Sequence, residues 1–204
     1  MKSLFLLYFC IISYTLSAQT DISGSVKNLV SFGFKAGINV SNMNFNKGEP
    51  APTTPIQASW KPDFALGLFM EVPVCNNLYI QPEYLYSQMA GEDKNSEEAY
   101  NMSYLSLPVL LKYKIGHKLA ILAGPQFDLL IKAEQKNSAE NSNITHDTEE
   151  RSISAIAGLE FNLIKPLNLG VRYLHGFNHI GIGQRSAVKE FKYEAVQLSA
   201  AVKF

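Results

Sequence analysis

The stretch from Tyr104 to Lys132, YLSLPVLLKYKIGHKLAILAGPQFDLLIK, decides the fold that we predict for this chain. It reads as two long strands joined at Gly116, His117 and Lys118, and alternate residues of each strand are apolar almost without interruption. Successive side chains of a strand point to opposite faces, so each strand presents one continuous apolar face. At about 12 residues, each strand is roughly twice the mean length in globular proteins, and it meets the roughly 9–11 tilted residues that cross a bilayer.

The same alternation recurs along the chain and predicts eight strands. Besides this hairpin, it covers residues 32–40, 63–72, 78–87, 153–163 and 167–174, and a last strand ends at Phe204. The connections alternate between long and short, as in up-and-down barrels of outer membranes, which have short periplasmic turns and long outer loops. An even number of strands also leaves no unpaired edge in lipid. The predicted fold is an all-β, eight-stranded antiparallel up-and-down transmembrane β-barrel.

Three prolines, Pro82, Pro108 and Pro125, lie inside predicted strands. Each removes one hydrogen-bond donor from a sheet, so we expect bulges or near-end positions at these residues.

The first residues predict a secretory signal peptide. Lys2 precedes an apolar run from Leu4 to about Ile12, and small residues precede a cut before Gln19. We therefore divide the chain into a signal peptide at 1–18, a short periplasmic lead at 19–30 and an outer-membrane β-barrel domain at 31–204. A short N-terminal anchor helix is the alternative for the leader. With Cys10 in the leader, the mature chain keeps only Cys75, which excludes an internal disulfide.

Composition narrows the class of protein. Lys+Arg and Asp+Glu both number 18, so the formal net charge is zero and there is no electrostatic footprint for nucleic acid. Beyond the leader, no apolar run of 18 or more residues predicts a membrane helix.

The direction of the apolar face separates a membrane barrel from a soluble barrel with its apolar face inward. The polar parity carries mostly small residues, which suit the narrow interior of an eight-stranded barrel. Charged residues follow the same parity, as expected when a basic residue on the lipid face costs about 2–4 kcal/mol. We predict a structural charge network in the lumen made of Lys35, Glu71, Glu83, Lys112, Asp128, Glu160 and Arg172, with Lys114 and Lys132 on the same face.

Within this network, we expect Glu71 and Glu83 to find basic partners among Lys35, Lys112 and Arg172. The apolar face then points to lipid, with aromatic girdles at its two edges. Phe32, Phe34, Tyr113, Phe161 and Phe204 would form the periplasmic girdle, and Phe64, Tyr84, Tyr86 and Tyr173 the outer one.

Three segments resemble the outer-membrane β-barrel family of Bacteroidota known as PorT-like. They are SFGFKAGINVSNMNF (31–45), FALGLFMEVPVCNNLYIQPEYLYSQMAGE (64–92) and the opening hairpin. The resemblance implies an exported eight-stranded barrel, and the family's namesake takes part in protein secretion across the outer membrane. The terminal VQLSAAVKF, ending at Phe204, is similar to the signal read by the barrel assembly machinery.

Histidines and serines offer weaker candidates for chemistry. His146 lies beside Asp147, Glu149 and Glu150 and suggests a metal site, although loop carboxylates are usually solvated. A lipid hydrolase would use a Ser/His pair near the outer leaflet, drawn from His175 or His179 with Ser186 or Ser87.

None of these candidates has a recognisable motif, and we predict no catalytic, metal or cofactor site. The expected function is that of a small non-enzymatic outer-membrane barrel, a binding or scaffold component of the cell envelope with a link to protein secretion. The alternatives are an outer-leaflet lipid-modifying enzyme and a narrow porin-like channel. The expected partners are outer-membrane lipid, the barrel assembly machinery, and envelope or secretion proteins, with no nucleic acid.

Overall fold

The structure of the protein is a computed structural model. It describes residues 30–47, 55–93, 98–136, 141–182 and 189–204. The predicted signal peptide therefore lies outside the described residues. In the described part, no helix is both long and apolar enough to cross a membrane.

Strands make up nearly all of the described chain, because the alternating pattern favours extended backbone wherever it occurs. Eight are long and two, β6 and β9, have three residues each; short 3-10 helices η2 (Phe45–Lys47) and η3 (Thr145–Asp147) lie in two connections. The strands are β1 (Ser31–Asn44), β2 (Ala58–Cys75), β3 (Leu78–Asp93), β4 (Glu98–Ile115), β5 (Leu119–Lys136), β6 (Asn141–Asn143), β7 (Arg151–Ile164), β8 (Leu167–Gly176), β9 (Ile180–Ile182) and β10 (Lys189–Lys203).

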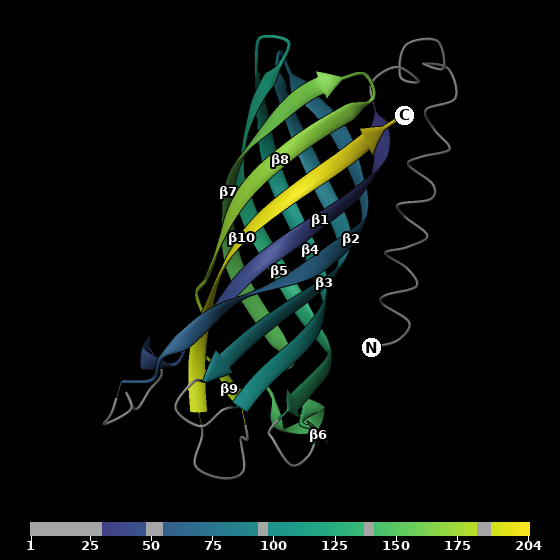
Figure 1. Ribbon diagram of the computed structural model, residues 1–204. Helices are drawn as coiled ribbons and strands as arrows, with labels where there is room; N and C mark the ends of the chain where they lie inside the picture. Colours follow the sequence, from purple (N-terminus) through teal and green to yellow (C-terminus); the bar gives the residue numbers. More distant parts are fainter. Residues whose placement is uncertain (1–29, 48–54, 94–97, 137–140, 183–188) are drawn as a thin grey trace, which may run out of the picture.

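The eight long strands form one closed antiparallel barrel (Figure 1). Each long strand pairs with its neighbour in sequence, and β1 closes the wall by pairing with β10 from Gly33↔Lys203 to Asn44↔Lys192. At the end of the wall, the backbone N–H of Phe204 donates to the carbonyl of Phe32 at 2.9 Å. This architecture confirms the predicted fold.

The alternating pattern fixes which side chains face outward. Apolar residues of the predicted lipid-facing parity are exposed around the wall, among them Phe34 (58%), Leu66 (55%), Leu111 (50%) and Leu198 (53%). The aromatic residues expected at the girdles are on this face too, and Phe34 packs against Phe204 with ring centroids 5.7 Å apart. So large an exposed apolar surface is costly in water and is explained by contact with lipid.

The three prolines are accommodated without the expected bulges. Pairing on either side of Pro82, Pro108 and Pro125 continues in one register, and the strands there are continuous. The β3–β4 ladder has a gap between Pro82↔Val109 and Leu85↔Ser106, and the β4–β5 ladder has one beside Pro108↔Gln126. The β2–β3 ladder has a third gap, between Phe69↔Glu83 and Val72↔Ile80, which contains Pro82. The prolines therefore interrupt three ladders without shifting their register. The register shifts of β2 lie instead near two other prolines, at residues 60–65 and 73–75.

Several strands are longer than predicted and extend past the apolar belt. β2, β4 and β5 have 18 residues each, and such a strand rises about 45 Å at a tilt of about 40°. The apolar band of an outer-membrane barrel is only about 25 Å tall. The part of the strands that extends past the apolar belt lies at the end with the long connections, and we call it the outer section. We call the part within the apolar belt the membrane section.

The polarity of the two faces of the wall reverses between these sections. On the outside, successive outward residues change from apolar to polar toward the outer end: Val40 to Asn42, Tyr86 to Gln88, Leu105 to Ser103, and Val196 to Glu194. On the inside the change is opposite, because Met43, Phe45, Met89, Met102 and Phe191 are buried at 1–2% exposure. The outer section is therefore built like a small soluble barrel on top of a membrane barrel.

Candidate functional site

The lumen of the membrane section holds a network of buried ion pairs centred on Glu83. Its carboxylate accepts hydrogen bonds from Arg172 Nη1 and Nη2 at 2.8 and 2.6 Å, and from Lys35 Nζ at 2.5 Å. Gln81 Nε2 donates a further bond at 2.6 Å. The three charged side chains are at most 3% exposed, so their charges are compensated by one another and not by bulk water.

A second group of buried charges lies nearer the short turns. Lys112 Nζ donates to Glu71 Oε1 at 2.6 Å and to Glu160 Oε1. The strands β2, β4 and β7 thus each contribute one member, all on the inward parity. Glu71 and Glu83 both have the basic partners that the sequence led us to expect. Lys35, Lys112 and Arg172 together balance Glu71, Glu83 and Glu160, three charges against three.

Asp128 does not join this network, contrary to the prediction. Its carboxylate is 1% exposed and accepts hydrogen bonds from Ser106 Oγ at 2.5 Å, Gln126 Nε2 at 2.8 Å and Tyr193 Oη at 2.5 Å. Among the described residues it has no cationic partner. Neutral donors from β4, β5 and β10 satisfy it instead.

Lys132 is also misplaced by the prediction. A bulge in the β4–β5 ladder follows Ser103↔Lys132, since the next pair is Tyr104↔Leu130. The extra residue reverses the parity of the end of β5, so that Ala133 is buried and Lys132 is exposed beside Glu134, with 2.6 Å between Nζ and Oε1.

An apolar core closes the lumen toward the outer end. It runs from Leu110 and Leu122 through Tyr104 to Met43, Phe45, Tyr100 and Phe191 in the outer section. Phe45 packs against both Tyr100 and Phe191, with ring centroids 5.7 and 5.5 Å apart. Sequence reasoning missed this core, although the signal was present: large apolar residues occupy the polar parity beyond residue 42 of β1 and before residue 104 of β4.

The outer section has an ion pair on its water-facing side, between Lys47 and Glu194. The Lys47 ammonium donates to Glu194 Oε1 at 2.8 Å, and this hydrogen bond raises the pKa of Lys47. Burial raises the pKa of the Tyr100 hydroxyl, which donates to Glu98 Oε2 at 2.8 Å.

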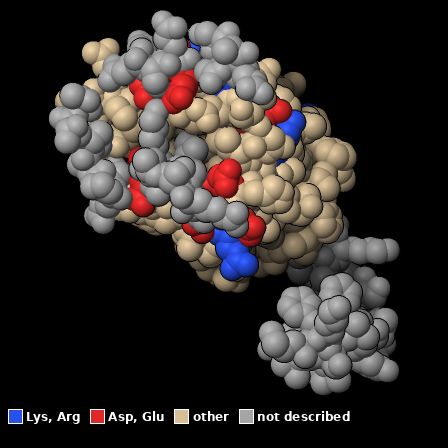
Figure 2. Space-filling view, turned by 90° about the horizontal axis from the view of Figure 1, so that it is seen from below, with Lys and Arg blue, Asp and Glu red and all other residues tan. Residues whose placement is uncertain are grey.

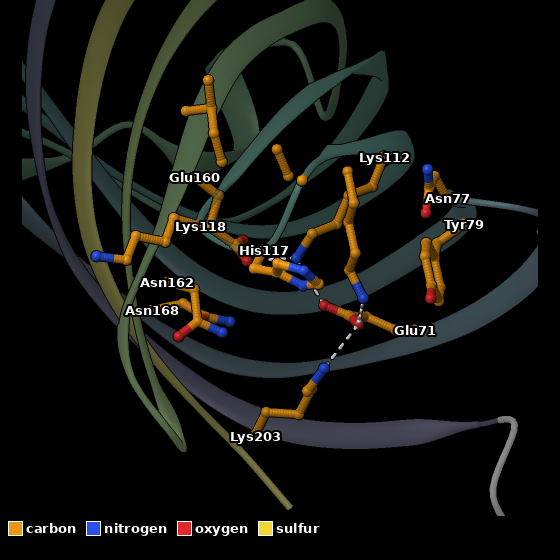
Figure 3. A pocket seen from close by; sticks show the side chains of 14 residues that line it. Glu71, Asn77, Tyr79, Lys112, His117, Lys118, Glu160, Asn162, Asn168 and Lys203 are labelled. Carbon is orange, nitrogen blue, oxygen red and sulfur yellow. Dashed lines mark hydrogen bonds and ion pairs between the residues drawn. The ribbon is translucent and has the colours of Figure 1, made fainter.

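A polar cavity of about 280 Å³ opens at the short-turn end (Figure 3). Its floor is the Glu71, Lys112 and Glu160 group, and its rim includes Lys118 and His117 from the β4–β5 turn. Lys203 donates to Glu71 Oε2 at 3.2 Å (Figure 3). Lys114 donates to the same atom, also at 3.2 Å. We call this cavity the vestibule.

The candidate catalytic pairs do not assemble among the described residues. His175 lies on the outward face between Tyr173 and Phe177, with ring centroids 6.2 and 6.0 Å away. Ser87 is buried in the lumen, where it accepts a hydrogen bond from Asn39 Nδ2 at 2.8 Å, so the wall separates it from His175. Ser186 lies outside the described residues. His146 is exposed in η3, and no group of three or more His, Cys, Asp or Glu side chains within the described ranges is arranged to hold a metal ion.

These features define a class of protein: a closed membrane β-barrel with an apolar outer belt and a filled lumen. Comparisons with known proteins identify the family. Residues 17–181 match the family model described as outer membrane protein beta-barrel domain, and the chain belongs to that family. Membership places the chain in the outer membrane.

Solved structures show the same fold. Neisserial surface protein A (NspA) is 13% identical, with a TM-score of 0.53 over 86% of this chain and 99% of the other. Ail, the attachment invasion locus protein of Yersinia pestis, is 14% identical, with a TM-score of 0.51 over 85% and 98% of the two chains. No curated protein sequence matches this chain.

Proposed function

We propose that this chain is a non-enzymatic outer-membrane barrel that acts by binding, as a scaffold component of the cell envelope. The observation that carries the proposal is the filled lumen. Three compensated charge pairs occupy its membrane section, and an apolar aromatic core closes its outer section. In a barrel built in this way, the interior side chains pack against one another and stabilise the fold. Only the exposed ends of the barrel remain for contact with other molecules.

The outer section is the surface best suited to such contact. Outward side chains such as Asn42, Gln88, Ser103 and Glu194 are polar, and they stand beyond the lipid belt on strands held by the apolar core. Figure 2 looks onto this end, where acidic side chains are prominent. We infer a protein partner with a complementary basic surface, because acidic side chains that are prominent on a surface attract oppositely charged partners.

The proposal includes the link to protein secretion that the PorT-like resemblance implies. It also includes export through the signal peptide at residues 1–18 and recognition of the last strand, ending at Phe204, by the barrel assembly machinery. Envelope or secretion proteins are the partners that we expect at the outer section.

Site-specific photo-crosslinking in the native envelope tests the proposal. A photoreactive amino acid replaces Asn101, which lies on the outward face of the outer section, and a matched variant carries it at Leu68 in the lipid belt. We expect a discrete protein adduct from position 101 and lipid adducts alone from position 68. Absence of any protein adduct from position 101 and from other outward positions of the outer section would refute a binding role for this surface.

A conductance measurement distinguishes the proposed binding role from the function of a channel. With Arg172 and Tyr104 at 1–2% exposure across the lumen, we expect planar bilayers containing the barrel to conduct at the level of protein-free bilayers. Discrete conductance steps would instead support the narrow porin-like alternative.

A further inference from the structure

The vestibule carries more positive charge than the lumen needs. The three fully buried cations of the lumen already balance the three glutamates, as described above. Lys114 and Lys203 are additional, and both share the Oε2 atom of Glu71, at 3.2 Å each. Their positive charge is therefore in excess of the anionic charge around them.

These two ammonium groups remain accessible from the short-turn end. The side chain of Lys114 is 27% exposed and that of Lys203 is 31% exposed, whereas Glu71 beneath them is 1% exposed. An ammonium group has three donors, and each of these makes only one of its hydrogen bonds with Glu71. The remaining donors can bind a second acceptor that enters the vestibule.

The surrounding wall holds the two ammonium groups in place. Lys114 Nζ lies 3.6 Å from the centre of the Tyr79 ring, which restrains the side chain from β3. Lys203 comes from the end of β10, on another part of the wall (Figure 3). The two cations therefore converge on Glu71 from separate strands. Lys118 and His117 at the rim add donors around the same 280 Å³ space.

We propose that the vestibule is a binding site for a small oxyanion of the phosphate class, entering from the periplasmic end. A compact group with two negative charges would neutralise the excess charge of Lys114 and Lys203 and take up their free donors. The low-dielectric wall strengthens this attraction compared with that of lysines on an open surface. The proposal goes beyond the binding role of the outer section and does not depend on it.

Titration of the full-length mature barrel in dodecyl maltoside micelles, which contain no phosphate, tests the site. Inorganic phosphate is added at low ionic strength and the NMR signals of ¹³C-labelled lysine side chains are followed. We expect saturable shifts of Lys114 and Lys203, and of Lys112 and Lys118, which line the same cavity and report on binding in every variant. The K114Q/K203Q variant is expected to bind about tenfold more weakly, whereas K114R/K203R keeps the affinity because it keeps both charges.

Lys61 provides the matched control, because it pairs with Glu92 in the outer section, far along the wall from the vestibule. K61Q should leave phosphate affinity unchanged. The proposal is overturned if no shift saturates, or if the wild-type barrel and K114Q/K203Q bind phosphate equally. Retained Lys112 pairs with Glu71 in each variant, so the fold is kept, and thermal unfolding checks this.

A second probe distinguishes the source of the anion. Glycerol 3-phosphate represents a phosphate ester such as a lipid headgroup, and inorganic phosphate represents the free ion. Tighter binding of the ester assigns the site to headgroups, and tighter binding of the free ion assigns it to periplasmic phosphate; both outcomes support the phosphate class.

Discussion

Replacing Glu83 with Gln should destabilise the barrel strongly, because it keeps the shape of the side chain and removes only its charge. Glu83 is held by Arg172 and Lys35 at 2.5–2.8 Å, and its side chain has no exposed surface. Removal of one partner from a buried ion pair costs about 3–5 kcal/mol, since the remaining charge is left uncompensated. Here two cations lose their shared anion, so we expect a value in the upper part of that range.

Urea unfolding of the barrel from lipid vesicles measures the effect. With a dependence of about 2–3 kcal/mol per molar urea, a loss of about 4 kcal/mol lowers the midpoint by about 1.5 M. Glu134→Gln is the control, because Glu134 pairs with Lys132 in an exposed bridge and should change the free energy of unfolding by less than about 1 kcal/mol.

A compensating variant tests the reasoning about charge balance. E83Q/K35M removes one cation together with the anion, which leaves Arg172 and Lys112 against Glu71 and Glu160 in the lumen. The double variant should therefore recover a substantial part of the lost stability. If E83Q shifts the midpoint no more than Glu134→Gln, or if the double variant is less stable than E83Q, the lumen is not stabilised by charge balance.

Three further predictions address other parts of the wall, each checked by the same unfolding measurement. Asp128→Asn should cost at least about 2 kcal/mol less than Glu83→Gln, because Asp128 has neutral donors around it and its replacement leaves no cation unpaired. Gly124→Ala should destabilise by about 1–3 kcal/mol, because its Cβ would lie 2.2 Å from the carbonyl oxygen of Val109 on the neighbouring strand. Met43→Asp should prevent stable folding of the outer section while Asn44→Asp is tolerated, since these adjacent residues face its apolar core and water, respectively; equal effects at the two positions would contradict the reversal of polarity.

The sequence predicted the membrane section well, because one rule governs it throughout. Side chains that face lipid must be apolar, so every second residue near the middle of a strand is apolar, as Phe34 and Leu111 are. The residues between them face the lumen, and this alternation correctly predicts that Glu83, Lys112 and Arg172 lie there. The small diameter of the barrel brings their opposite charges together.

The ends of the strands were predicted less well, because the rule changes there. Beyond the lipid, the outward face must be polar and the inward face apolar, so the stretch from Asn42 to Phe45 no longer resembles the strand that it continues. The alternation that predicts this strand therefore ends at residue 40. The position of Lys132 depends on a single bulge, and periodicity alone does not reveal where an extra residue enters a ladder.

The partners of Asp128 illustrate a third limit. Its inward direction follows from parity, but which cations come within reach depends on how the strands are staggered around the barrel. That stagger is a property of all eight strands together, fixed by pairs as distant as Ile38↔Leu198, and no local stretch of sequence contains it.

Closure of the wall by β1 and β10 has a consequence for the order in which the barrel forms. The hydrogen bonds between Phe32 and Phe204 lie where the first and last long strands meet, so the wall is closed only when β10 has paired with β1. Before then, β1 and β8 each carry an edge whose backbone groups would cost several kcal/mol apiece in hydrocarbon. A barrel without β10 would leave both of these edges unpaired in lipid, so the pairing of β10 with β1 is what makes the wall stable in a bilayer.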